Sequence, residues 1–249
     1  MRGRSISLST SRRMINDLMY FGVRTPMVSV ERVMNLKDVI AARNACAKRP
    51  AWATILAKAY ALTAQDMPEL RRVYLNLPWP RIYEYPTSVA AITLTRIVDG
   101  EPWVFARLIK SPETHGIADL ANIIDSAGQV PVTDVQEFRR IMQIQRLPTF
   151  LRRLLWRVGL NRGRWRARMF GTFIVTSVSH LGTAALFTPT PTNMVTIGVI
   201  EPDGRVAMRY IFDHRVFDGI VVANALTRLE EVLNGAILDE LRAMAKLPP

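Results

Sequence analysis

The pattern of apolar and polar positions predicts alternating helices and strands from the first residues onward. Apolar residues three and four positions apart predict a helix over 9–19, which Ser9 or Ser11 can cap. The alternating stretch 25–34 then predicts a strand. The next helices are expected on either side of Pro50, because proline interrupts a helix. They span 35–47 and 51–64.

The middle of the chain contains a strong hairpin pattern. Two runs rich in β-branched residues, 88–97 and 103–109, are separated by the turn pair Asp99-Gly100. Stretch 66–74 is interpreted as a turn that contains a proline. Helical spacing returns afterwards and predicts helices over 113–124 and 135–144.

The last third begins with β-branched runs and ends with helical spacing. Strands are predicted over 172–179, 193–200 and 205–213, and Pro202-Asp203-Gly204 is expected to turn the second into the third. A helix is expected to start after Asp218 and to stop at Asn234-Gly235. Its apolar side carries Val222, Ala225, Leu226, Leu229, Val232 and Leu233. Together the elements predict an α/β layered fold with a mixed sheet, without strict βαβ alternation.

Length and composition are those of a chain with a sizeable core. The 249 residues, 49% of them apolar, are expected to form a single domain over 1–249. No apolar run is long enough to cross a bilayer, and the basic start lacks the apolar stretch of a secretory signal. The single Cys46 excludes internal disulfides and cysteine metal clusters. We therefore expect a cytoplasmic protein that uses no metal.

The net charge of +12 is concentrated in one segment. Ten arginines and no acid lie between Arg139 and Arg168, which leaves 12 − 10 = +2 for the remainder. This concentration is interpreted as a basic amphipathic insertion at about 139–169. A uniformly basic surface is absent, so nucleic-acid binding is not expected.

Within the insertion, stretch 149–168 has helical amphipathicity and three possible roles. Arg152, Arg153 and Arg157 lie opposite an apolar side. The first role is a helix packed on its own domain with a solvated basic face. The second is a surface helix on anionic lipid. The third is a dock for an acidic partner, such as an acyl carrier protein or the phosphates of coenzyme A. The apolar side is formed by Phe150, Leu151, Leu154, Leu155 and Val158.

His214 is the main candidate for chemistry. It follows the strand predicted over 205–213, where the sheet would hold the ring while leaving it accessible, and histidine takes up a proton near neutral pH. Asp218 stands where the last helix begins, so it can cap the backbone of Ile220 or Val221. A histidine at a strand end is often merely structural, and spacing alone leaves that alternative open.

The wider sequence resembles a known acyltransferase family. The stretch "DHRVFDG", 213–219, is similar to the His-x-x-x-Asp-Gly signature of coenzyme A-dependent acyltransferases. The stretch "TSVSHLG", 176–182, the following "FTP" and the opening "LSTSRRMINDLM" resemble further blocks in the same order. The closest resemblance is to the catalytic domain of the dihydrolipoamide acyltransferases of 2-oxoacid dehydrogenase complexes. Chloramphenicol acetyltransferase is a relative with the same fold. The resemblance implies a two-layer α/β sandwich with a mixed sheet.

The resemblance also implies roles for residues. His214 would be the general base that deprotonates the acyl acceptor, which then attacks an acyl-coenzyme A thioester or a carrier-protein thioester directly. Ser179 would donate to the oxyanion. Asp218 would support the site by pairing with Arg12, or else with Arg13. The aromatic stretch "WPRIYEYP", 79–86, is a candidate wall of the acceptor pocket.

The family resemblance implies a homotrimer whose active sites lie between chains. The sequence departs from the family in two ways. It has no lipoyl domain, so no lipoyl group is expected on this chain, and its end, "LDELRAMAKLPP", differs from the tails that join trimers into cages. We expect an isolated trimer. The alternative is a non-catalytic trimeric scaffold that binds a membrane surface through 149–168, or an acidic partner.

Overall fold

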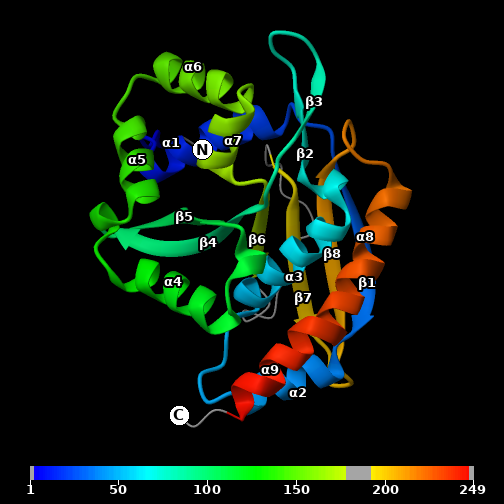
Figure 1. Cartoon of the computed structure of the whole chain (residues 1–249). Helices are drawn as coiled ribbons and strands as arrows, with labels where there is room; N and C mark the ends of the chain where they lie inside the picture. Colours follow the sequence, from blue (N-terminus) through cyan, green and yellow to red (C-terminus); the bar gives the residue numbers. More distant parts are fainter. Residues whose placement is uncertain (1–2, 178–191, 247–249) are drawn as a thin grey trace.

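The computed structural model describes residues 3–177 and 192–246. Within them, one mixed sheet of six strands organises the molecule (Figure 1). Neighbours β4–β6 and β6–β7 are parallel, and the other pairs are antiparallel. In spatial order the strands are β1 (Met27–Asn35), β8 (Arg205–Asp213), β7 (Met194–Ile200), β6 (Phe173–Ser177), β4 (Val89–Val98) and β5 (Glu101–Lys110).

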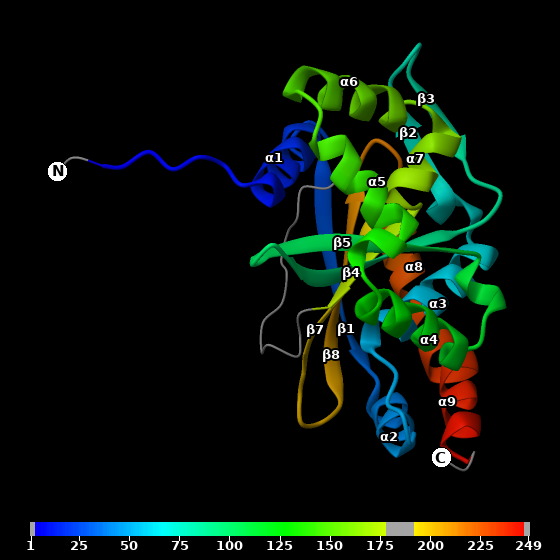
Figure 2. The ribbon, with the colours of Figure 1, turned by 90° about the vertical axis from the view of Figure 1, so that its left-hand side faces the viewer.

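A layer of helices covers one face of the sheet (Figure 2). The main core lies between the two layers and includes Ile55 and Leu56 of one helix together with Met208 and Phe212 of β8. The architecture is thus a two-layer α/β sandwich with a mixed sheet, as the sequence predicts. The covering helices are α2 (Lys37–Ala45), α3 (Trp52–Asp66), α4 (Ile117–Gln129), α8 (Gly219–Val232) and α9 (Leu238–Ala245).

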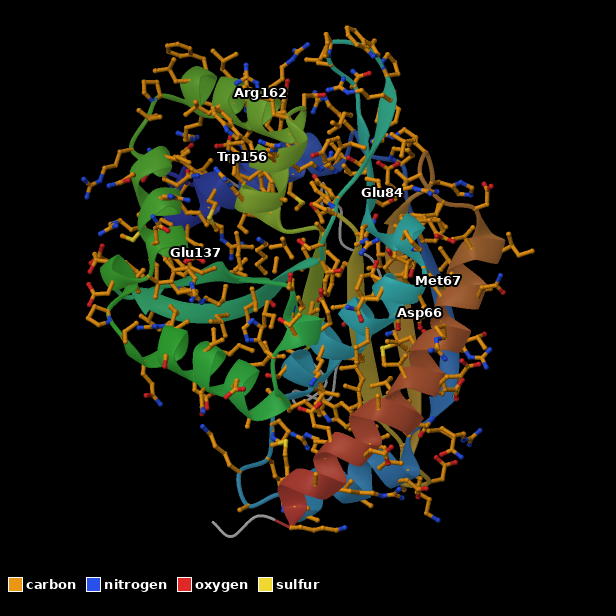
Figure 3. All side chains as sticks on the ribbon, viewed as in Figure 1. Asp66, Met67, Glu84, Glu137, Trp156 and Arg162 are labelled. Carbon is orange, nitrogen blue, oxygen red and sulfur yellow. The ribbon has the colours of Figure 1, made fainter. Side chains whose placement is uncertain are left out.

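A smaller apolar cluster joins α1 (Thr10–Gly22) and α5 (Gln136–Gln145) to strand β5. Phe138 stacks on Phe105 with ring centroids 4.5 Å apart. Beside this contact, Arg107 donates two hydrogen bonds to the Glu137 carboxylate, at 2.7 and 2.9 Å (Figure 3). Ser9 Oγ accepts from the backbone of α1, so the predicted cap is confirmed.

The two predicted turns need left-handed backbone. Asp99 and Gly100 have φ of 54° and 77° and join β4 to β5. Gly204 has φ of 86°, and a Cβ there would lie 2.7 Å from Lys37 Cα. Glycine is required at 204 both by the conformation and by this close approach.

The final helix does not stop at Asn234-Gly235, so that prediction is wrong. A π-helical turn, Leu233–Ile237, carries α8 directly into α9. The apolar stripe continues across the junction through buried Leu233, Ile237 and Leu241. Burial of this stripe maintains the helix through a pair of residues that are usually helix breakers.

A short hairpin begins within stretch 66–74, where the sequence predicts only a turn. It consists of β2 (Arg72–Leu75) and β3 (Arg81–Glu84), and a 3₁₀ turn, Pro68–Arg71, precedes it. Further 3₁₀ turns are Pro112–Thr114 and Val132–Asp134.

The basic insertion forms α6 (Thr149–Leu160) and α7 (Gly163–Phe170). Helix α6 packs on its own domain, as the first interpretation of stretch 149–168 has it, but by the side that carries Arg152 and not by its apolar side. Arg152 is 2% exposed, whereas Leu154 is 54% exposed. The cause is a buried ion pair, in which Arg152 Nε donates to Asp17 Oδ2 at 2.6 Å. Among the described residues, no helix is long and apolar enough to cross a membrane.

Candidate active site at the end of strand β8

His214 is the first residue after β8, at the start of a turn over 214–216. Its backbone N–H donates to the carbonyl of Pro26 at 3.0 Å, which ties the turn to the segment before β1. The side chain is exposed, and its ring centroid lies 5.8 Å from that of Phe212. The backbone is therefore held in place while the imidazole remains accessible.

Asp213, just before the histidine, is buried and organises the turn. Its Oδ1 accepts from the backbone N–H of Arg215 at 3.0 Å and from Arg215 Nε at 2.9 Å. Its Oδ2 accepts from Arg215 Nη2 at 2.7 Å. The backbone N–H of Asp213 donates to Asn193 Oδ1 at 3.2 Å, which adds a contact from the segment before β7. A carboxylate bound on both oxygens is compensated for its burial, and it fixes the chain on both sides of His214.

Asp218 stands before α8 without the predicted cap bond. Its carbonyl accepts from the backbone of Val222 at 3.3 Å, but its side chain caps nothing. The side chain is exposed, so the expectation that it caps Ile220 or Val221 is wrong. The exposed carboxylate is solvated and does not need the helix backbone.

The expected support pair is not formed among the described residues. Arg12 is exposed on α1, and no salt bridge between described residues joins it to Asp218. Arg13 Nη2 donates to Thr10 Oγ1 instead. The buried carboxylate on α1 is Asp17, which binds Arg152 and Arg153. The other predicted site residue, Ser179, lies outside the described residues.

A buried polar cluster lies behind the turn and includes a residue that sequence reasoning missed. Arg166 of α7 donates to the carbonyls of Tyr74 and Leu160, at 3.0 and 3.4 Å. Burial lowers the pKa of Arg166 to about 10, while the charges of Tyr85 and Asp213 act in the opposite direction. A cavity of about 10 Å³ beside Arg166, Asp213 and Asn193 has room for one water. Ten arginines in one segment gave no signal that this one is buried.

An open groove of about 500 Å³ begins on the other side of Arg215. The Arg215 guanidinium lies 4.1 Å from the ring centre of Tyr74. The guanidinium groups of Arg24 and Arg153 lie 3.7 and 3.9 Å from the ring centre of Tyr20. Among the described residues that line this groove, hereafter the arginine groove, none is acidic. Tyr85 of the predicted aromatic wall 79–86 lines the small cavity beside Asp213, whereas the arginine groove is lined by residues just before this stretch. The lining comprises Tyr20, Phe21, Arg24, Thr25, Tyr74, Asn76, Leu77, Phe150, Arg153, Leu154, Arg157, Leu160, Asn161, Arg166 and Arg215.

The sequence assigns no chemistry to His115 or Cys46, and both have simple surroundings. His115 follows the turn Pro112–Thr114, apart from the β8 end. Cys46 is buried at the end of α2, and burial raises the pKa of its thiol. Among residues 3–177 and 192–246, no group of three or more His, Cys, Asp or Glu side chains could hold a metal ion.

The fold is shared with acetyltransferases of known structure, although no family model and no curated protein matches the sequence. The probable dihydrolipoamide acetyltransferase of Listeria monocytogenes has a TM-score of 0.67 at 16% identity, over 93% of this chain and 94% of that chain. The dihydrolipoamide acetyltransferase of Azotobacter vinelandii has a TM-score of 0.66 at 14% identity, over 98% and 94%. Chloramphenicol acetyltransferase has a TM-score of 0.51 at 14% identity, over 91% and 96%. The chain therefore has the fold of the dihydrolipoamide acyltransferase catalytic domains and of chloramphenicol acetyltransferase, as its sequence resemblance implies.

Proposed function

We propose that this protein is an acyltransferase in which His214 is the general base. The observation that carries the proposal is the placement of His214. Its backbone is fixed by Pro26 and by the Asp213–Arg215 pair, and its ring is exposed at the end of β8. A base that is held in place and open to substrate is what direct acyl transfer requires.

The reaction begins when the imidazole of His214 takes the proton from the thiol, hydroxyl or amine of the acceptor. The acceptor atom then attacks the carbonyl carbon of an acyl thioester, carried by coenzyme A or by a carrier protein. Ser179 would stabilise the resulting oxyanion. The carbon–sulfur bond breaks as the tetrahedral intermediate collapses, and the departing thiolate receives the proton from the imidazolium. No acyl-enzyme is formed.

A solved relative supports the choice of residues. For the Azotobacter vinelandii enzyme, roles in the catalytic mechanism have been investigated for a serine, a histidine and an asparagine four positions after the histidine. Here Asp218 stands four positions after His214. An aspartate in place of an asparagine adds a charge, and we propose that Arg12 of α1 neutralises it in the assembled protein.

We further propose that the working form is a homotrimer with its sites between chains. His214 lines neither the arginine groove nor the cavity beside Asp213, and that cavity of about 10 Å³ is far below the several hundred Å³ of typical small-molecule sites. A neighbouring chain would supply the second wall of the substrate channel. The same small cavity favours the alternative, a non-catalytic trimeric scaffold of this fold.

Thiol release from acyl-coenzyme A distinguishes the two functions. Wild type, His214→Ala and the matched control His115→Ala would be assayed with thiol, hydroxyl and amine acceptors. We expect His214→Ala to lose about 10²-fold or more in rate, and His115→Ala to retain the wild-type rate. Equal rates for wild type and His214→Ala across these acceptors would contradict the enzyme and favour the scaffold.

A further inference from the structure

The outward face of α6 is apolar. Phe150, Leu151, Leu154 and Leu155, hereafter the outer stripe, are 70%, 37%, 54% and 39% exposed. Spacings of one, three and four residues place them on one side of the helix. Side chains of this kind are normally buried, and a contiguous exposed group of them indicates a surface that binds something.

The inner face of α6 prevents the outer stripe from turning inward. Arg152 is bound to buried Asp17. Trp156 (Figure 3) stacks on Phe21 with ring centroids 5.8 Å apart and meets Phe170 edge to face with centroids 5.0 Å apart. Rotating the helix would break this ion pair and expose the indole. The described part of the chain therefore leaves the outer stripe uncovered.

Positive charge borders the outer stripe. Phe150 and Leu154 line the arginine groove together with Arg153 and Arg157. Arg157 is exposed, and its side chain forms no hydrogen bond or salt bridge with the described residues. A partner that binds the outer stripe must therefore also be compatible with guanidinium groups along the edge of the stripe.

The β2–β3 hairpin adds an aromatic side chain at the same end of the molecule. In Figures 1 and 2 the hairpin tip and α6 both lie at the upper end. Trp79 in the tip is 65% exposed, and the Arg81 guanidinium lies 5.8 Å from its ring centre. Indole and guanidinium groups are favoured at the boundary between water and lipid.

We propose that this end of the molecule docks on the surface of a membrane that contains anionic lipids. The outer stripe would enter the boundary between headgroups and acyl chains, and Arg153 and Arg157 would bind lipid phosphates. A second copy that met this surface with the same surface would oppose arginine with arginine, and burial of the outer stripe against a different surface of a trimer neighbour is an outcome of the test below. An acidic protein would match the charge but would not account for the exposed aliphatic side chains of the outer stripe. The proposal is independent of the acyltransferase function.

Vesicle flotation tests the role of the outer stripe. Wild type is expected to float with vesicles of phosphatidylglycerol and phosphatidylcholine, and more weakly with phosphatidylcholine alone. Leu154→Glu is expected to weaken binding by about tenfold or more. Its matched control is Ile97→Glu at an exposed position of β4, 65% exposed, which should bind as wild type does. Circular dichroism verifies that both variants are folded.

A second matched pair of variants tests the role of positive charge in vesicle binding. Arg157→Gln is expected to weaken binding to the anionic vesicles, whereas Arg49→Gln, at an exposed arginine between α2 and α3, should not. Added salt should reduce wild-type binding. His214→Ala should bind like wild type, which separates docking from catalysis. Absence of vesicle binding by folded wild type would overturn the proposal. Equal losses of vesicle binding in Leu154→Glu and Ile97→Glu would also overturn it. So would a smaller assembly of Leu154→Glu than of wild type in light scattering, if wild type does not bind vesicles.

Discussion

Arg152 of α6 and Asp17 of α1 form a buried ion pair, with 2.6 Å between Nε and Oδ2. Arg152 Nη1 also donates to the carbonyl of Leu147 at 2.8 Å, and Arg153 Nε donates to the other oxygen of Asp17 at 3.3 Å. The carboxylate is thus compensated on both oxygens, and the two helices are fixed relative to each other. This pair determines which face of α6 meets the body of the protein.

Arg152→Met should therefore destabilise the protein by about 3 kcal/mol, because it leaves a buried carboxylate with one weaker partner. Arg153→Gln is the control and should cost about 1 kcal/mol or less, since that side chain is 32% exposed and its bond is longer. Urea unfolding gives both values. The double variant Asp17→Leu/Arg152→Met should be more stable than Arg152→Met alone. If Arg152→Met has wild-type stability, the ion pair does not orient α6.

Substitution by alanine is expected to have opposite effects at two glycines, one in the continuous helix α8–α9 and one in the turn between β7 and β8. Gly235 lies in the π-helical turn with open space around it, so Gly235→Ala should stabilise the protein by about 0.5 kcal/mol. Gly204→Ala should destabilise it by about 2 kcal/mol or more, because of its positive φ and its contact with Lys37. Thermal unfolding measures both. Destabilisation by Gly235→Ala would indicate that the helix ends at this glycine.

Local sequence patterns correctly predicted the elements that depend only on neighbouring residues. The Asp99-Gly100 turn and the buried side of α8 were both predicted correctly, because each depends on neighbouring residues. The orientation of α6 could not be predicted. Helical spacing defines two faces, but the choice between them depends on Asp17, 135 positions away in the sequence. The strands β2 and β3 have four residues each, too few for a clear period.

Only part of the candidate site was predicted from the sequence, because the rest depends on contacts between distant residues. His214 was predicted at a strand end and is found there. The contacts that hold it come from Pro26 and Asn193, which no spacing around position 214 identifies. Arg166 contributes through burial, which is a tertiary property. The roles of Ser179, Asp218 and Arg12 stay predictions.

A buried tyrosine should make stability depend on alkaline pH. Burial raises the pKa of Tyr85 to about 12, and the hydroxyl forms no hydrogen bond among the described residues. The folded state thus holds this proton more tightly than the unfolded chain. The stabilisation of the folded state that comes from this difference in pKa is present below the ordinary pKa of about 10 and is lost as pH rises from about 10 to about 12.

Tyr85→Phe should remove the part of the alkaline loss of stability that is due to Tyr85. The variant should match or slightly exceed wild-type stability at about pH 8, because it removes an unpaired buried hydroxyl, and its advantage should grow at about pH 11. Urea unfolding at the two pH values provides the measurement. Part of the alkaline loss should persist, because burial also raises the pKa of Tyr60 and Tyr210, whose hydroxyls lie 2.6 Å apart. An advantage that shrinks with rising pH would contradict the assignment.

Mixing two inactive variants tests most directly whether one chain's imidazole acts together with a neighbour's hydroxyl. His214→Ala and Ser179→Ala would be unfolded together in equal amounts, refolded, and assayed for transfer from acyl-coenzyme A. Random assembly of trimers pairs an intact histidine with an intact serine at about a quarter of the interfaces. The account predicts recovery of about a quarter of the wild-type rate from two preparations that are each nearly inactive alone. No recovery from mixed, folded trimers would contradict a site shared between chains.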